Sequence, residues 1–272
     1  MKAGEGRLLH LRPLVIAALH LPPFLPGAMP SPAQLEDYVL ANAGLFADAG
    51  IPAIKLQDET RAPGPASTAT VALMASLGRL IKKQFPDIVL GIIVQAHDAV
   101  APIAIAHACG AEFVRLKVFA GAAVTAEGVR QGLGAEAIAY RGSIGAGAVA
   151  VIADAHDRTC QPLASVSDER AALWVETLGA DAVILTGSSF SDSLQRIAAA
   201  RRVGLRSPVL IGGGIDETNV AAALAEAAGV VVSSSLKRDG AGPADLVQWE
   251  AGKVARFMDK ARAAVQRQEK YS

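Results

Sequence analysis

The sequence predicts an α/β protein with a single (β/α)8 barrel, the TIM-barrel fold of the phosphate-binding type, and a closing helix at the C-terminus. Eight short apolar runs rich in β-branched residues recur along the chain, with helical stretches between them. Within each run nearly every residue is apolar, as parallel strands covered on both faces require. The length of 272 residues suits eight such units. A doubly wound sheet shows the same alternation, but the even count and the single-domain length over residues 1–272 favour the barrel.

The eight predicted strands share this apolar, β-branched character, and several end in polar side chains. In chain order they are Leu14–Leu21, Ala53–Gln57, Val89–Gln95, Phe113–Phe119, Val149–Ala155, Ala182–Thr186, Pro208–Ile211 and Val230–Ser234.

The predicted helices begin with a clear capping signal. Ser31 is a suitable N-cap residue, Pro32 follows at the first helical position, and Gln34 stands where a capping box needs it. The later helices show apolar residues at helical spacing, and the last is amphipathic. They are expected at Ala66–Phe85, Ala99–Cys109, Glu127–Arg141, Ser167–Leu178, Ser191–Val203, Glu217–Ala227 and Pro243–Gln268.

Composition excludes several classes of function. Lys and Arg total 26 and Asp and Glu total 26, and aromatic residues are only 4%, so neither a basic face nor stacking platforms for nucleic acid are expected. The most apolar early stretch, Leu14–Leu21, is too short to cross a membrane. Two cysteines, Cys109 and Cys160, fit a reducing compartment. We therefore expect a cytoplasmic protein with no transmembrane segment, and its apolar composition favours a homo-oligomer.

Charged and polar residues stand at the ends of the first five predicted strands. In a barrel of this class the carboxyl ends of the strands carry the chemistry. A structural layer of ion pairs, with Arg115 held by Asp98 or Asp154, is the alternative interpretation for single residues. Polar residues at five strand ends together favour a functional site over a structural layer. The predicted catalytic residues are His20, Asp98, Arg115, Lys117 and Asp154, and the predicted substrate-lining residues are Gln57, Asp58, His156 and Lys237.

No cofactor is predicted. Asp154, His156 and Asp157 are weak candidate ligands for a divalent metal such as Mg²⁺ or Zn²⁺, and a solvated loop is the favoured interpretation of that string. Lys55 or Lys117 would form a Schiff base only if its pKa were lowered by burial, and a paired cation is favoured for both.

The last two predicted strands run into loops of small residues. Such loops let backbone N–H groups approach a phosphate, and many barrels bind phosphate at these two positions. A tight turn is the alternative explanation for a lone triple glycine. The predicted phosphate-binding residues are Gly187, Gly212, Gly213, Gly214, Asn219, Ser234 and Ser235.

The order of these motifs resembles the BtpA/SgcQ family over most of the chain. The resemblance extends from His20-Leu21 with Pro26-Gly27 to Leu236–Gly240, and includes Gly110–Arg115 and Gly212–Asn219. It implies a phosphate-binding barrel and a family label of photosystem I biogenesis factor associated with membranes, with relatives encoded among sugar-utilisation genes. The chain departs from the family pattern where it has Gln57-Asp58, Ala96-His97, Lys117 and Arg158-Thr159.

Two functions therefore compete. The first is an isomerase, a lyase or a glycosidic-bond hydrolase that acts on a small phosphorylated substrate, a sugar phosphate or a ribosyl phosphate. The phosphate would lie in the last two loops, with acid/base chemistry at the ends of strands one to five. The second is a non-catalytic assembly factor of the BtpA type with a vestigial site. A charged layer that faces one cavity favours the enzyme.

Overall fold

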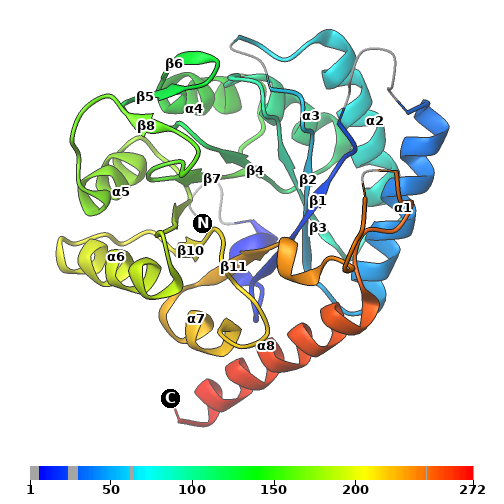
Figure 1. Ribbon diagram of the computed structural model, residues 1–272. Coiled ribbons are helices and arrows are strands. Elements are labelled where there is room, and N and C mark those ends of the chain that lie inside the picture. Colours follow the sequence, from blue (N-terminus) through cyan, green and yellow to red (C-terminus); the bar gives the residue numbers. More distant parts are fainter. Residues whose placement is uncertain (1–5, 24–29, 62–63, 243, 272) are drawn as a thin grey trace.

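The computed structural model describes residues 6–23, 30–61, 64–242 and 244–271. Eight parallel strands close into a barrel in the order β1-β11-β10-β9-β7-β4-β3-β2, which confirms the predicted fold. Figure 1 shows the helices arranged around this ring. The barrel strands are β1 (Val15–His20), β2 (Ala53–Gln57), β3 (Val89–Ile93), β4 (Phe113–Leu116), β7 (Ala150–Asp154), β9 (Ala182–Leu185), β10 (Val209–Ile211) and β11 (Gly229–Val232).

The helices surround the strands, and the capping signal read at Ser31 is confirmed. The Ser31 hydroxyl accepts a hydrogen bond from the Gln34 amide, and the Gln34 side chain accepts one from the Ser31 amide. The α-helices are α1 (Pro32–Asp48), α2 (Thr68–Gln84), α3 (Ala101–Cys109), α4 (Gly134–Ser143), α5 (Asp168–Thr177), α6 (Phe190–Arg202), α7 (Val220–Glu226) and α8 (Ala251–Tyr271); η1 (Arg7–His10) and η2 (Ser234–Leu236) are short 3-10 helices.

One predicted helix is partly wrong. Residues 127–131 of the helix expected at Glu127–Arg141 belong to a hairpin of β5 (Ala122–Thr125) and β6 (Gly128–Gln131), and α4 begins only at Gly134. Gly128 has φ of +118°, a conformation that suits glycine and turns the chain back. The short strand β8 (Gln161–Pro162) extends this small sheet.

The closing helix also begins later than expected. It starts at Ala251 rather than Pro243, which lies outside the described residues, as does the Pro26-Gly27 pair. Val254, Phe257 and Met258 of α8 are buried, and Trp249 packs its ring edge-on against Phe46 at 5.2 Å between centroids. This apolar face therefore covers the barrel. No helix in the described part of the chain is long and apolar enough to cross a membrane.

The interior of the barrel is apolar in the half nearer the amino ends of the strands. Side chains alternate between the two faces of each strand, so every second residue points inward. The inward set forms one buried cluster, and Leu8 of η1 closes it from below. Phe113 fills the space beside Gly91, where any added Cβ would overlap its ring. The cluster consists of Leu8, Leu14, Ile16, Ala53, Val89, Phe113, Ala150, Ile152, Ala182, Ile184, Leu210 and Val231.

Candidate functional site

The next inward layer, toward the carboxyl ends of the strands, is charged. Arg115 follows Phe113 by two residues, Asp154 follows Ile152, and Lys55 follows Ala53, so each shares the inward face of its strand. Arg115 donates two hydrogen bonds to Asp154, from Nε at 2.9 Å and from Nη2 at 2.7 Å. Burial alone would lower the pKa of Arg115, but the charge and hydrogen bonds of Asp154 raise it overall. Of the two partners considered for Arg115, the structure selects Asp154.

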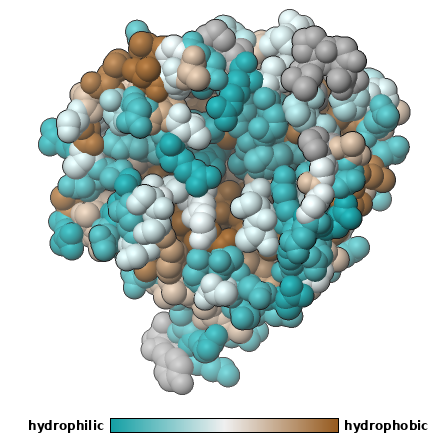
Figure 2. All heavy atoms as spheres, in the orientation of Figure 1, coloured by the Kyte–Doolittle hydropathy of each residue, from teal (hydrophilic) through white to brown (hydrophobic). Residues whose placement is uncertain are grey.

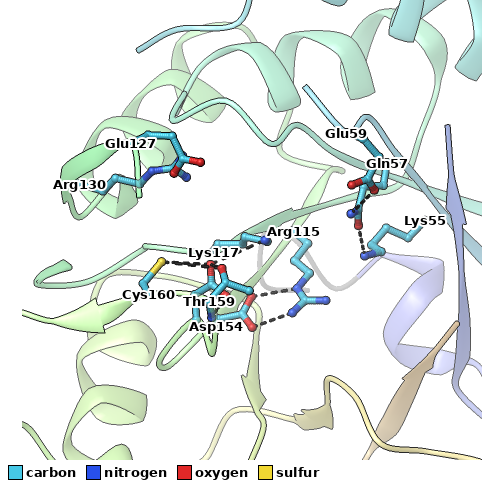
Figure 3. Close-up of polar contacts among 11 residues, drawn as sticks. Lys55, Gln57, Glu59, Arg115, Lys117, Glu127, Arg130, Asp154, Thr159 and Cys160 are labelled. Atoms are coloured by element: carbon cyan, nitrogen blue, oxygen red, sulfur yellow. Dashed lines mark hydrogen bonds and ion pairs between the residues drawn. The ribbon is translucent and has the colours of Figure 1, made fainter. Parts of the chain in front are cut away.

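Lys55 lies in this layer without a carboxylate partner in the described part of the chain. Its Nζ donates to Gln57 Oε1 at 2.6 Å, and the side chain is buried (Figure 3). Burial lowers the pKa of Lys55 well below its ordinary value, and the nearby charges of Arg115 and Lys117 lower it further. Lys55 therefore has an amide oxygen as its partner, where a cation paired with a carboxylate was expected.

A chain of hydrogen bonds continues from Lys55 to the barrel mouth. Gln57 Nε2 donates to Glu59 Oε1 at 2.9 Å, and the same oxygen lies 2.7 Å from His20 Nδ1. The other ring nitrogen, His20 Nε2, lies 3.3 Å from Ser233 Oγ. Burial lowers the pKa of His20, and the hydrogen bond with Glu59 only partly opposes this. The structure thus links β1, β2 and the loop after β11 through one polar chain.

Glu59 and Ser233 were missed as site residues. Both follow an inward-facing residue by two positions, Glu59 after Gln57 and Ser233 after Val231, so strand alternation was the available signal. Asp58, which was predicted to line the site, instead binds backbone amides. It accepts hydrogen bonds from the amides of Gln95 at 2.7 Å and Thr60 at 3.1 Å. Burial raises the pKa of Asp58 to about 6.

Asp98 also binds loop backbone. Its Oδ1 accepts from the amides of Val100 and Ala101, both at 2.8 Å, and its Oδ2 accepts from the amide of Ala66 at 2.9 Å. The residue lines a narrow pocket with Arg115 and Lys117. Its carboxylate therefore organises the entry to α3, and three amide donors occupy it.

The three candidate metal ligands do not converge. Asp154 is held by Arg115, and His156 Nδ1 lies 3.1 Å from Asp168. Asp157 accepts from the Thr159 amide at 3.0 Å and lies 3.7 Å from Lys117 Nζ. Burial alone would raise the pKa of Asp157, but the charge of Lys117 and these hydrogen bonds lower it overall. Within the described residues, no three His, Cys, Asp or Glu side chains form a metal-binding group.

The glycine loop after β10 lies against arginine side chains. A Cβ at Gly213 would stand 3.1 Å from Nη1 of Arg158, and one at Gly212 would stand 3.4 Å from Nη2 of Arg115. Gly214 has φ of +72°, which favours glycine there. Arg158 is exposed and has no recorded ion pair in the described part of the chain. It was not among the predicted site residues.

Polar side chains hold this loop in shape. Asn219 Nδ2 donates to the Gly214 carbonyl at 2.9 Å, and Ser235 Oγ donates to the Ile215 carbonyl at 2.7 Å. The second bond ties the loop after β10 to the loop after β11. The Thr186 hydroxyl is buried beside Gly212 and has no hydrogen-bond partner among the described residues. A buried hydroxyl of this kind is costly to leave unpaired.

Two predicted residues, Gly187 and Lys237, form hydrogen bonds with residues outside this loop. The Gly187 amide donates to Ser193 Oγ at 2.9 Å, so it is occupied. Lys237 Nζ donates to Gln248 Oε1 at 3.2 Å and lies 5.5 Å from the centre of the Trp249 ring. Lys237 is thus tied to the segment before α8.

A cavity of about 190 Å³ opens beside the charged layer. Lys117, His156 and Asp157 line one part of it, while Val118, Leu163 and Trp174 are among the apolar residues of its wall. Figure 2 shows this face of the molecule hollowed near its centre, with hydrophilic side chains around the hollow. His156, one of the predicted substrate-lining residues, is thus placed in the wall of this cavity.

The closed ring of eight parallel strands places the chain among the TIM-barrel proteins, and its charged inner layer lies at the carboxyl end of that barrel. The chain belongs to the BtpA family, whose model matches residues 12–263. It is 31% identical over 205 residues to the photosystem I biogenesis protein BtpA of Synechocystis sp., covering 73% of this chain and 71% of that protein.

Solved structures show the same fold at low identity. 3-Hexulose-6-phosphate synthase has a TM-score of 0.56 and 18% identity, covering 92% of this chain and 98% of that chain. Phosphoribosyl anthranilate isomerase of Thermus thermophilus has a TM-score of 0.53 and 15% identity, covering 93% and 99%.

Proposed function

We propose that the protein is an enzyme acting on a small phosphorylated metabolite of the sugar phosphate or ribosyl phosphate type. The observation that carries this proposal is the position of Arg158. Its guanidinium group has no recorded ion pair among the described residues and lies over Gly213, where no side chain keeps a ligand away from the backbone. A guanidinium group matches the geometry of phosphate oxygens.

The neighbouring loop supplies further donors for the phosphate. The amides of Gly213, Gly214, Ser234 and Ser235 make no recorded hydrogen bond in the described part of the chain. Free amides of adjacent loops form a concave site for an anion. Because Ser235 binds the Ile215 carbonyl, the two loops are held side by side before any ligand binds.

The reacting part of the metabolite would lie toward the charged layer. His20 is the proposed acid/base group, because its neutral form can accept a proton and Glu59 orients it. Lys117 and Arg115 would stabilise negative charge that develops in the reaction. This arrangement suits an isomerase, a lyase or a glycosidic-bond hydrolase, and two of the structural neighbours carry names of sugar-phosphate and phosphoribosyl enzymes.

A thermal-shift titration tests the proposal with inorganic phosphate, ribose 5-phosphate and unphosphorylated ribose. A ligand at about 100 times its Kd stabilises the folded state by about 2.7 kcal/mol. For a domain of this size that corresponds to a rise in Tm of about 5–10 °C. We expect ribose alone to give no shift. Arg158→Ala should weaken phosphate binding by about 10- to 100-fold, since it removes a charge-assisted hydrogen bond.

Arg202→Ala is the matched control, because Arg202 is an exposed arginine on the outer helix α6. It should leave the shift unchanged. If neither phosphate compound shifts the Tm of folded wild-type protein, the phosphate proposal is wrong and the assembly-factor alternative gains support.

One observation favours the assembly-factor alternative. Val129 and Leu163 are more than half exposed, and Figure 2 shows hydrophobic side chains gathered over β5 and β6. We propose the same apolar face as the contact of a homo-oligomer.

A further inference from the structure

Three side chains at the barrel mouth have the connectivity of a nucleophile, a base and an orienting acid. Ser233 Oγ lies 3.3 Å from His20 Nε2, and His20 Nδ1 lies 2.7 Å from Glu59 Oε1. The side chains of His20 and Glu59 are 29% and 28% exposed, so a small molecule can reach them. Ser233 is also partly exposed. The three residues come from different strand ends, so the barrel itself holds them together.

The proton positions in this chain follow from its bonding. Burial alone would raise the pKa of Glu59, but hydrogen bonds from His20 and Gln57 lower it overall, so Glu59 is an ionised acceptor at neutral pH. His20 must then donate through Nδ1. Its pKa is lowered by burial, so the ring is neutral and Nε2 is an acceptor. The remaining proton lies on Ser233, which donates toward His20.

We propose that Ser233 is a nucleophile activated by His20, with Glu59 as the positioning residue, and that it accepts the phosphoryl group of a phosphomonoester. The inference rests on the phosphate site proposed above, and it adds the transfer of a phosphoryl group to a side chain, a step that isomerisation, lyase and glycosidic reactions do not include. Ser233 directly precedes Ser234, whose amide belongs to that phosphate site. The proposed transfer therefore requires that a phosphate bound to the Ser234 amide come within reach of the hydroxyl of the preceding residue.

The proposed reaction needs only the phosphomonoester and water. His20 Nε2 takes the Ser233 proton while Oγ bonds to phosphorus, and the ester P–O bond breaks. The leaving alcohol receives that proton from His20. Water then attacks the phosphoserine while His20 takes its proton, the Oγ–P bond breaks, and His20 returns that proton to Ser233 Oγ as inorganic phosphate leaves. Arg158 and the loop amides stabilise the charge on the transferred phosphoryl oxygens.

The first measurement separates the nucleophile from the phosphate site. A fluorophosphonate is an electrophilic phosphorus compound without a phosphate charge, and attack by Ser233 forms the O–P bond as fluoride leaves. We expect one covalent label, placed on Ser233 by peptide mass spectrometry. Ser233→Ala should lose it. His20→Gln should slow labelling by about 100-fold or more, the usual contribution of a general base.

Matched controls come from residues outside the site. Ser143→Ala on α4 and His107→Gln on α3 change exposed residues and should label at the wild-type rate. The phosphate-induced Tm shift should persist in Ser233→Ala, which also shows that this variant is folded. Equal labelling of wild type and His20→Gln, or no label on Ser233 while phosphate still raises the Tm, would overturn this inference and leave the proposed function intact.

Two further measurements test Glu59 and the phosphomonoester. The charged groups around His20 are Glu59, Lys55 and Lys237. Removing the Glu59 charge with Glu59→Gln should move the pH midpoint of labelling downward, since that charge raises the pKa of His20. A purely structural role would slow labelling without this movement. Wild type should also hydrolyse p-nitrophenyl phosphate, and Arg158→Ala should slow that reaction while labelling by the fluorophosphonate continues.

Discussion

Replacing Asp154 by Asn tests whether the Arg115–Asp154 pair organises the charged layer. The variant keeps the size of the side chain and removes its charge. The Arg115 guanidinium, 11% exposed, would then lie near Lys55 and Lys117 with its close counter-charge lost. Breaking a buried pair on one side costs about 3–5 kcal/mol, because an uncompensated charge remains. The two hydrogen bonds of 2.9 and 2.7 Å place this pair at the upper end of that range.

Urea unfolding at pH 7 measures this cost. The control is Glu226→Gln, which breaks the pair of Arg201 with Glu226, whose side chains are 51% and 54% exposed. That change should cost less than about 1 kcal/mol, because solvent screens an exposed pair. Replacing both members of the buried pair, Arg115→Met with Asp154→Leu, should cost less than Asp154→Asn alone. A loss in Asp154→Asn as small as that of the control would refute the reasoning.

Two other predictions concern the folded state. Gly91→Ala should destabilise the protein by about 1–3 kcal/mol, because its Cβ overlaps the buried Phe113 ring, whereas Gly147→Ala meets nothing within 4 Å and should be near neutral in the same urea titration. The raised pKa of Asp58, about 6 against 3.8, means that the folded state holds this proton more tightly, so the free energy of unfolding should fall by about 2 kcal/mol as pH rises from 4 to 6. Asp58→Asn should flatten that fall, and an unchanged slope would show that another group titrates there.

The barrel was predictable from the sequence because strand burial leaves a direct pattern. Runs such as Val89–Ile93 and Val149–Ala153 are apolar along their whole length, which only two-sided coverage explains. The hairpin at Ala122–Gln131 left a weaker pattern. It lies outside the barrel, and its burial changes from residue to residue, so the apolar spacing also fitted a helix.

The candidate site was only partly predictable, for two different reasons. The pairing of Arg115 with Asp154 followed from strand ends that meet in one barrel. Asp58 was predicted as a lining residue and Glu59 was not, although the alternation that begins at Lys55 already indicated the inward position of Glu59. The contact of Arg158 with Gly213 could not be predicted, because it joins loops far apart in sequence and depends on loop geometry.

The charged layer and the hydrogen-bond chain depend on each other. Asp154 raises the pKa of Lys55, while Arg115 and Lys117 lower it, so these charges oppose one another and burial decides the direction. Glu59 is the carboxylate of the hydrogen-bond chain from Lys55 to Ser233, and its hydrogen bonds come from Gln57 and His20. His20 can then accept a proton and become the counter-charge of Glu59, which costs less than creating an isolated buried charge. Burial lowers the pKa of His20, and the charges of Lys55 and Lys237 lower it further, so the base at the barrel mouth is neutral and can accept a proton.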